Sequence, residues 1–471
     1  MKNKLIIIGT GLFAIIICYI AGSNTLGGIE YKSKQHIVAQ TEEVCQESAD
    51  FCTHLPLVII DTNNQDIPGV AKDGSTILTN ISIIDNQNSG NHKEDAPTLE
   101  TKANIHYRGN SSMYFDKKGY LLKFVDAEGD ENKLKVMGME KNDEWVLHGP
   151  FLDKTLMRNY LWYHIASEIM DSAPNSRFCE LIVDGKYQGL YVMIEAPTRG
   201  EKARMPISKY KNDRPYTSYI VKLDKKDKDE TNDIYPFTKY SYNNQMNLEV
   251  VYPGKSKLTP EILKFIEKDF SKFEKSLYSY DYRSEKYGYQ SYIDVDSFIN
   301  YYIINEFTLN FDAGNMSTYL YKDAKGKLNM YVWDFNSAND YYDKPMKIDD
   351  FQFQWNVWYY MLMKDEKFTN RIISRYRYLR KHSLNEEYLL NYIDEIISYL
   401  GSAISRNYEV WGYSFNEEED IIEPSERNVR SYDEAISQLK ENIILRGNFL
   451  DKNIETIKQY SHESKVKKFN H

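Results

Sequence analysis

Short apolar runs separated by polar residues occupy the chain from residue 57 to about residue 215. The runs are four to six residues long, are rich in branched and aromatic side chains, and are bounded by Gly, Pro, Asn and Asp, which is typical of β-strands. They cover residues 57–60, 81–84, 103–107, 120–125, 178–183 and 190–194. Asp184-Gly185 predicts a tight hairpin between the last two. One helix interrupts the strands, because residues 154–170 carry apolar side chains at helical spacing.

Beyond about residue 258 the apolar spacing becomes helical. The predicted helices cover residues 260–277, 295–309, 367–381, 386–401 and 432–459. The charged run Lys222–Glu230 alternates in sign and predicts a solvated loop. A strand-rich half followed by a helix-rich half indicates an α+β protein, with a small N-terminal lobe over residues 56–215 and a larger C-terminal lobe over residues 216–471.

The N-terminus has the pattern of an export segment. Lys2 and Lys4 precede an apolar run over residues 5–20, and Ala21-Gly22-Ser23 offers the small residues of a cleavage site. The run is slightly short for a membrane span, which takes about 20 residues. Residues 1–23 are therefore predicted to be either a cleaved signal peptide or a membrane anchor, and the protein to be exported or membrane-anchored.

The segment over residues 24–55 shows no sustained period and predicts a dispensable tether between the membrane and the folded domain. Cys45 and Cys52 lie close enough in this segment to form a disulfide in an oxidising compartment. The alternative is two free thiols.

Composition narrows the class of protein. Hydrophobic residues make up 42% and charged residues 27% of the chain, which is the composition of a globular protein. The formal net charge is −10. Because phosphate neutralisation needs a basic surface, we expect no nucleic-acid partner.

A first candidate site lies at a turn between two predicted strands, Ile105–Ser112 and Lys117–Lys123. The turn brings together backbone N–H groups, the hydroxyls of Ser111 and Ser112, and Arg108, which together suit an anion. The alternative is an ordinary hairpin with exposed lysines.

A second candidate is the aromatic strand Tyr187–Glu195, which ends in a carboxylate shortly before Pro197. A strand end that delivers backbone groups into a cleft suits a purine ring. The alternative is a core strand with a capping Glu195.

The third candidate is the most informative. The helix from Asp294 to about Leu309 is followed by Asp312 and Asn315, and a strand pair then delivers Asp334, 22 residues after Asp312. Two acids at such positions suit phosphoryl transfer, in which one Asp accepts the hydroxyl proton while an Asn and a second Asp hold a metal ion. The alternative is two exposed loop acids. However, Asp334 stands between Trp333 and Phe335, and an acid beside such neighbours usually has a partner.

In order and spacing, these motifs resemble the CotH kinase family over roughly residues 100–340. The residues that carry the resemblance are Arg108-Gly-Asn-Ser-Ser112 with Lys117, Lys118 and Tyr120; Leu156-Met-Arg-Asn159; Asp184–Tyr191 with Glu195; Asp312 and Asn315; and Trp333-Asp-Phe335. The resemblance implies an atypical, two-lobed protein-kinase fold over about residues 56–460. It also implies the use of ATP and of a divalent cation, Mg²⁺ or Mn²⁺, with serine residues of coat or cell-surface proteins as substrates.

The resemblance also assigns roles position by position. Asp312 corresponds to the catalytic-loop aspartate, Asp334 to the metal-binding aspartate, and Asn315 to a residue that assists the metal. Glu195 would lie at the hinge, near the adenine. Nucleotide-binding positions are Arg108, Ser111, Ser112 and the lysines Lys117, Lys118 and Lys123, among which Lys118 is favoured as the catalytic lysine and the choice stays open. The chain departs from the family at Asn336, where a second Asp is common.

The leading hypothesis is thus a membrane-anchored or exported kinase of the cell surface or spore coat. The competing hypothesis is a coat or surface scaffold that keeps the fold for binding. The pairing of Asp312 with Asp334 favours the enzyme, because a scaffold has no physical need for both acids. A two-carboxylate glycoside hydrolase is a third reading, but it leaves the Arg108 turn unexplained.

Overall fold

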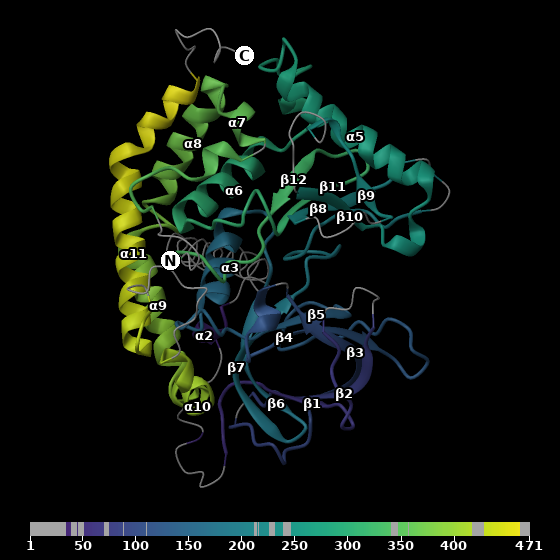
Figure 1. Cartoon of the computed structure of the whole chain (residues 1–471), viewed down its shortest axis with the longest axis vertical. Coiled ribbons are helices and arrows are strands. Elements are labelled where there is room, and N and C mark those ends of the chain that lie inside the picture. The colour runs from purple at the N-terminus through teal and green to yellow at the C-terminus, as the bar shows by residue number, and fades with distance from the viewer. Residues whose placement is uncertain are drawn as a thin grey trace, which may run out of the picture.

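The computed structural model shows a β-barrel beside a helical region that contains its own sheet (Figure 1). It describes residues 34–38, 45, 51–69, 75–87, 89–109, 111–211, 214, 216–225, 231–238, 246–340, 347–356, 358–416 and 428–461. Strands dominate the N-terminal half and helices the C-terminal half, as the apolar spacing predicts. The export segment predicted at residues 1–23 lies outside the described residues. Within the described part of the chain, no helix has the length and apolar character of a membrane span.

The barrel closes through the strand order β1-β2-β3-β4-β5-β7-β6. These strands are β1 (Leu57–Asp61), β2 (Ile77–Ile84), β3 (Leu99–Arg108), β4 (Gly119–Val125), β5 (Glu144–His148), β6 (Ser176–Val183) and β7 (Lys186–Glu195). Neighbouring strands are antiparallel except β1 and β6, whose parallel pairing closes the barrel. Alternating apolar side chains fill its interior, among them Val58, Ile81, Ile105, Leu122 and Leu147.

Helix α3 (Arg158–Ile169) lies between the barrel and the C-terminal helices (Figure 1). Ten of its twelve residues are buried, so it is covered on nearly all sides. A helix that is buried all round joins the parts that pack against it into one core.

The C-terminal half contains a five-stranded sheet of order β12-β11-β8-β10-β9, in addition to helices. Its strands are β8 (Tyr219–Lys225), β9 (Asp233–Ile234), β10 (Met246–Tyr252), β11 (Thr318–Lys322) and β12 (Leu328–Tyr331). The helices are α5 (Pro260–Tyr278), α6 (Val295–Thr308), α7 (Tyr359–Leu362), α8 (Glu366–Leu379), α9 (Glu386–Leu400), α10 (Ser402–Trp411) and α11 (Tyr432–Asn453). The loop predicted over Lys222–Glu230 is wrong for residues 222–225, which end β8, and residues 226–230 lie outside the described chain.

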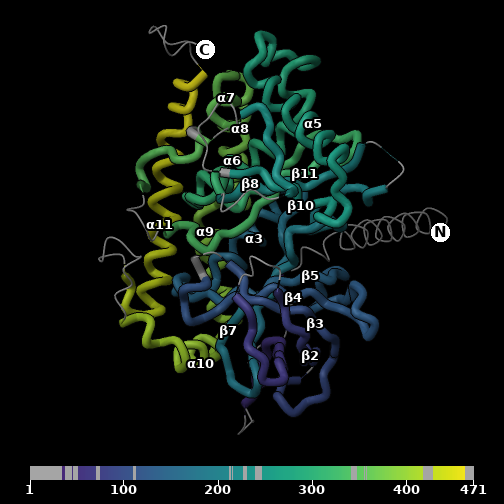
Figure 2. The backbone as a smooth tube through the Cα atoms, turned by 45° about the vertical axis from the view of Figure 1, so that its right-hand side comes forward, coloured from purple at the N-terminus to yellow at the C-terminus, as the bar shows by residue number. Residues whose placement is uncertain are grey.

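Helix α10 packs along strand β7 of the barrel, and both views show the two side by side (Figures 1 and 2). The amide oxygen of Asn407 accepts a hydrogen bond from the Leu190 N–H at 3.1 Å, and the Trp411 indole N–H donates to the Gln188 carbonyl at 2.8 Å. Gly189 has φ of 91°, and a Cβ there would lie 2.6 Å from the Asn407 oxygen. The C-terminal half therefore packs against the barrel at a position where only glycine fits.

The segment over residues 24–55, predicted as a dispensable tether, contains residues that pack onto the domain, and its dispensability stays a prediction. In the short helix α2 (Gln35–Val38), the buried Gln35 side chain donates to the Phe178 carbonyl at 3.0 Å and accepts from the Phe178 N–H at 2.7 Å. It thus pairs with strand β6 much as another strand would. The disulfide predicted as one of two alternatives is present and joins Cys45 to Cys52.

Candidate active site

The loop after β12 holds Asp334 in an uncommon backbone conformation. Its φ is 62°, a left-handed value that residues other than glycine adopt only where their surroundings hold them. Two side chains of α3 do so: the Tyr163 hydroxyl accepts a hydrogen bond from the Asp334 N–H at 3.0 Å, and Asn159 Oδ1 accepts one from the Phe335 N–H at 2.8 Å. Because they are four residues apart, Asn159 and Tyr163 share one face of the helix. This face of α3 therefore fixes the position of the Asp334 loop.

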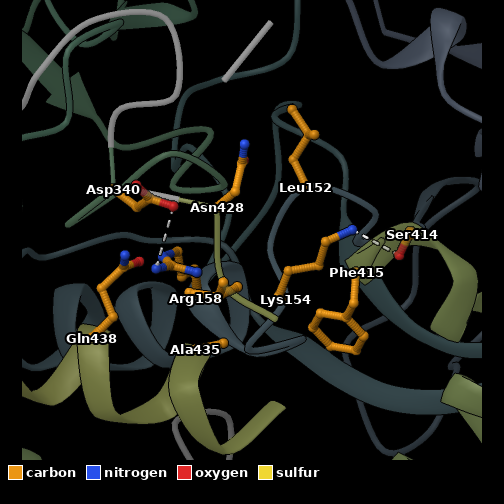
Figure 3. A pocket seen from close by; sticks show the side chains of 10 residues that line it. Leu152, Lys154, Arg158, Asp340, Ser414, Phe415, Asn428, Ala435 and Gln438 are labelled. Atoms are coloured by element: carbon orange, nitrogen blue, oxygen red, sulfur yellow. Dashed lines mark hydrogen bonds and ion pairs between the residues drawn. The ribbon is translucent and has the colours of Figure 1, made fainter. Parts of the chain in front are cut away.

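Arg158, at the first position of α3, holds the end of the same loop. Its side chain is 2% exposed, its Nε donates to the Ala338 carbonyl at 2.8 Å, and its guanidinium pairs with the buried carboxylate of Asp153. Figure 3 shows Arg158 beside Asp340, whose carboxylate lies 3.9 Å from Nη2. The structure thus gives a physical reason for the Leu156-Met-Arg-Asn159 motif: successive residues of α3 bind successive parts of one loop.

The loop after α6, which carries Asp312, is tied to the Asp334 loop through Asn310. The buried Asn310 amide donates to the Asp334 carbonyl at 3.2 Å and to Asn305 Oδ1 at 3.0 Å. Because Asn305 belongs to α6, these hydrogen bonds fix the loop after α6 relative to both the helix and the Asp334 loop.

A tight turn follows Asp312. The backbone N–H groups of Asn315 and Met316 donate to the Asp312 carbonyl at 3.0 and 2.6 Å. Gly314 has φ of 81°, and a Cβ at this position would lie 2.2 Å from the Asn356 amide nitrogen. Both Asp312 and Asn315 are half-buried. The turn therefore has a defined shape that only glycine permits.

Arg108 connects the barrel to the Asp334 loop. It ends β3, and its guanidinium carbon lies 5.0 Å from the centroid of the Trp333 ring, next to Asp334 in the chain. Burial raises the pKa of Asp334 and the positive charge of Arg108 opposes this rise. Among the nucleotide-binding candidates whose side chains the structure describes, Arg108 is the one in contact with the Asp334 loop.

The predicted lysines contact other parts of the protein. The buried Lys117 donates to the Leu190 carbonyl at 2.7 Å and to Asn407 Oδ1 at 2.6 Å, and burial lowers its pKa well below the usual value. Lys118 donates to two carbonyls of the preceding turn, those of Met113 and Phe115. The ammonium of Lys123, half-exposed, lies 3.7 Å from the Glu144 carboxylate. The choice among the three lysines therefore stays a prediction. The backbone of Ser111 and Ser112 forms a 3-10 turn, and their side chains are not described.

Glu195 ends strand β7 and is completely buried. Burial raises its pKa to about 7, although the guanidinium of Arg204 lies 3.5 Å from its carboxylate. Its N–H donates to the Asn175 carbonyl at 3.1 Å. This environment matches the simpler interpretation of a buried strand end, and the role near adenine stays a prediction.

A sequence model described as CotH kinase protein matches residues 105–450, which is well over half of the chain. The chain belongs to the CotH kinase family. The match begins near the end of β3 and runs into α11, so both acid-bearing loops of this CotH protein lie inside it. No curated protein matches the chain. Family membership indicates kinase activity, and with it the use of ATP.

The sequence did not reveal several charged neighbours of the CotH site. Lys222 on β8 lies 3.3 Å from Asp224 and 3.2 Å from Glu249 of β10. The charge of Asp224 contributes, after burial, to the raised pKa of Asp334. The alternation of charge after residue 222 predicted a solvated loop, so the ion pairs of Lys222 were not predicted. Tyr163 gave no sequence signal beyond its place in the helix predicted over residues 154–170.

The side chains predicted to hold a metal, Asp334 and Asn315, fit a divalent cation chemically. Carboxylate and amide oxygens from Asp334 and Asn315 are ligands that Mg²⁺ and Mn²⁺ accept, and Mg²⁺ commonly takes one or two carboxylates and completes its shell with water and phosphate oxygens. No preformed cluster of three His, Cys, Asp or Glu ligands occurs among the described residues.

Proposed function

We propose that this CotH family member is an atypical, two-lobed protein kinase that transfers the γ-phosphate of ATP to serine hydroxyls of Ser-rich coat or cell-surface proteins. The observation that carries the proposal is the Asp334 loop: α3 holds its backbone through Asn159 and Tyr163, while Arg108 approaches from the barrel. A fixed carboxylate opposite a guanidinium suits the binding of a cation and the phosphates that it screens.

Each residue of the site has a role in this proposal. Asp312 orients the acceptor serine and takes its proton, and Asp334 with Asn315 holds Mg²⁺ or Mn²⁺, which supplies positive charge to the phosphates when bound. Arg108 and the Ser111–Ser112 turn bind phosphate oxygens. One of Lys117, Lys118 and Lys123, with Lys118 favoured, also binds the phosphates. Glu195 lies at the hinge, near the adenine.

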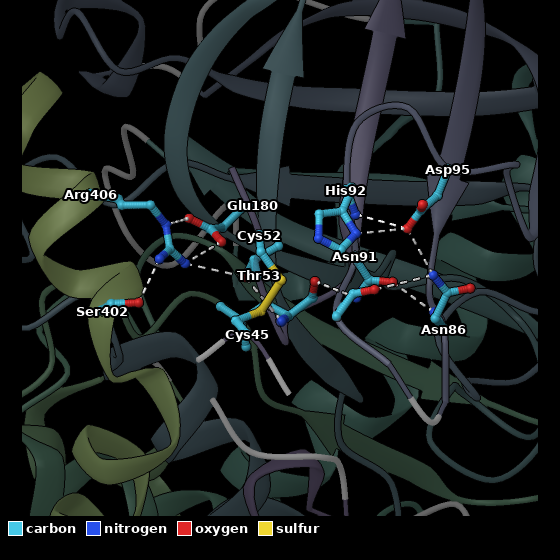
Figure 4. Close-up of a disulfide and its surroundings, with 12 residues drawn as sticks. Cys45, Cys52, Thr53, Asn86, Asn91, His92, Asp95, Glu180, Ser402 and Arg406 are labelled. Atoms are coloured by element: carbon cyan, nitrogen blue, oxygen red, sulfur yellow. Dashed lines mark hydrogen bonds and ion pairs between the residues drawn. A yellow bond between two sulfur atoms is a disulfide. The ribbon is translucent and has the colours of Figure 1, made fainter. Parts of the chain in front are cut away.

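We propose that the protein is membrane-anchored or exported, at the cell surface or the spore coat. Residues 1–23 would serve as its membrane anchor or signal peptide. The disulfide between Cys45 and Cys52 supports export, because such bonds persist mainly in oxidising compartments. Figure 4 shows it next to Thr53, to which the Arg406 guanidinium donates at 3.3 Å while pairing with Glu180 at 2.7 Å. The disulfide thus lies where the N-terminal segment meets both the barrel and α10.

A scaffold function is the second candidate, and two observations favour it. Lys117 and Lys118 already donate to protein acceptors in the structure, so a phosphate would have to displace those bonds. Asn336 also lacks the charge that the family commonly has at that position. A protein that binds partners without transferring phosphate would show both features.

The deciding experiment incubates the full-length chain with γ-labelled ATP, Mg²⁺ or Mn²⁺, and a Ser-rich coat protein. We expect metal-dependent label on serine, lost in Asp334→Asn and retained in the control Asp296→Asn, whose carboxylate is 77% exposed on α6. Absence of label with either metal, despite binding of the Ser-rich protein, would favour the scaffold.

A further inference from the structure

A pocket lies where the start of α3, the loop after Asp334 and the C-terminal segments meet (Figure 3). The polar side chains that line it are those of Lys154, Arg158, Asp340, Ser414, Asn428 and Gln438. None of these residues is among those proposed to bind the nucleotide or the metal. The pocket is therefore a separate feature of the fold.

Two buried cationic side chains line this pocket. Lys154 is 7% exposed and Arg158 is 2% exposed. The Lys154 ammonium donates to Ser414 Oγ at 2.7 Å and lies 4.6 Å from the centroid of the Phe151 ring. Removing cations from water costs free energy that nearby negative charge can offset. A pocket built on two such groups favours an anionic ligand.

Asp340 is the one carboxylate among the lining residues, and its contact with Arg158 is loose. The two groups are 3.9 Å apart, beyond hydrogen-bonding distance, and the Asp340 side chain is 25% exposed at the edge of the pocket. The carboxylate of Asp153 also pairs with Arg158 and offsets part of its positive charge. Burial and then the charge of Lys154 lower the pKa of Lys117, while the charge of Asp153 opposes this.

Hydrogen-bond donors complete the pocket. The side-chain amides of Asn428 and Gln438 line it together with the ammonium of Lys154 and the guanidinium of Arg158 (Figure 3). Ammonium, guanidinium and amide groups are the donors that proteins use for tetrahedral oxyanions, with Arg especially suited to phosphate.

We infer that this pocket is a second ligand site, for a phosphate-type oxyanion, and that the oxyanion competes with Asp340 for Arg158. Asp340 lies six residues after Asp334, and Arg158 holds the Ala338 carbonyl between them at 2.8 Å. An oxyanion that replaces Asp340 at Arg158 therefore changes the tether of the Asp334 loop. The regulatory meaning of this coupling rests on the proposed kinase function, whereas the binding of the oxyanion does not.

Calorimetric titration of the full-length chain with inorganic phosphate, without nucleotide or divalent cation, tests the site. We expect saturable binding that is weakened by about tenfold or more in Lys154→Gln, which loses a charge-assisted donor, and in Gln438→Glu, which adds a like charge. Lys325→Gln, at the exposed β11–β12 turn, should bind as the parent does. O-phosphoserine should compete if the natural ligand is a phosphomonoester, and fail to compete if it is free phosphate; both results keep an oxyanion site.

Hydrogen exchange tests the coupling separately. Phosphate should change the exchange of the amides over residues 334–340 in the parent chain and leave it unchanged in Gln438→Glu. That variant lies on the half-buried face of α11 and keeps the test available if Lys154→Gln does not fold. Absence of saturable binding, or equal affinity in the parent and Gln438→Glu, would overturn the site. Binding without a change in exchange would overturn the coupling. None of these readouts depends on ATP, so failure here is distinct from failure of the kinase proposal.

Discussion

The hydroxyl of Tyr163 accepts a hydrogen bond from the backbone N–H of Asp334 at 3.0 Å, across 171 residues of sequence. This bond connects the helix that precedes the last barrel strands to the loop that follows the C-terminal sheet. Because it acts on the backbone, it fixes the conformation of Asp334 without occupying the carboxylate. The carboxylate oxygens stay available to other partners, among them the backbone of Asn336.

Replacing Tyr163 by Phe should impair the site while the aromatic ring still fills its place in the core. The change removes the acceptor and leaves the Asp334 N–H without its side-chain partner, which should lower the free energy of unfolding by about 1–3 kcal/mol. We expect the rate of phosphoryl transfer to fall by roughly tenfold or more, with a smaller change in the KM for ATP. The control is Tyr282→Phe, whose hydroxyl contacts Lys364 away from the site. Equal transfer rates in the two variants would contradict the assigned role of Tyr163.

Removing the charge of Arg108 should change the pH dependence of the reaction. Burial raises the pKa of Asp334 and Arg108 opposes it, so Arg108→Met should raise that pKa further. The ionised carboxylate is the proposed metal ligand, and the acid limb of the kcat/KM profile should therefore move to higher pH. Arg108→Lys keeps the charge and should keep the limb near its original position. An unchanged acid limb in Arg108→Met would show that Arg108 does not act on Asp334.

Much of the barrel was predictable because its signals are local. The runs over residues 120–125 and 178–183 became β4 and β6, and Asp184-Gly185 forms the expected turn, with φ values of 48° and 74°. The parallel pairing of β1 with β6 was not predictable, since it depends on closure of the whole barrel. Helix α2 is too short to show a period, and it is held by Phe178, 143 residues from Gln35.

The site was predictable where residue type and chain position coincide, as for Asp334 between Trp333 and Phe335. Its surroundings were not, because they come from distant parts of the chain. The contact of Lys117 with Asn407 spans 290 residues, and no local pattern indicates that α10 reaches the barrel. Lys222 was misread because sign alternation is typical of exposed loops, whereas here one cation is shared by acids on two neighbouring strands.

Glu195 should make the stability of the protein fall as pH rises. Burial raises its pKa from 4.5 to about 7, so between these values the folded state keeps a proton that the unfolded state releases. This group alone should lower the free energy of unfolding by ~3 kcal/mol between pH 4.5 and 7. Urea unfolding from pH 5 to 8 should show a shallower decline in Glu195→Gln than in the parent, with exposed Glu201→Gln as the control. Parallel profiles for Glu195→Gln and the parent would place the titration elsewhere.

The N-terminal helix α2 should contribute measurable stability. Gln35→Ala removes both hydrogen bonds to the Phe178 backbone and should lower the free energy of unfolding by roughly 2–4 kcal/mol. Ile37→Ala, at a position on the same helix that is 61% exposed, should change it by less than about 0.5 kcal/mol. Urea midpoints measure both. Equal midpoints would support the interpretation of residues 24–55 as a dispensable tether.

The separate roles of Asp312 and Asp334 are the central claim, and nucleotide binding measured beside phosphoryl transfer tests it most directly. In full-length Asp334→Asn and Asp312→Asn, transfer to a Ser-rich protein should be abolished in both. The Mn²⁺ dependence of ATP affinity, measured by titration, should be lost in Asp334→Asn and preserved in Asp312→Asn, because one acid holds the metal and the other accepts the serine proton. A fully active Asp312→Asn variant, or ATP affinity that responds to Mn²⁺ equally in both variants and the parent, would contradict the account.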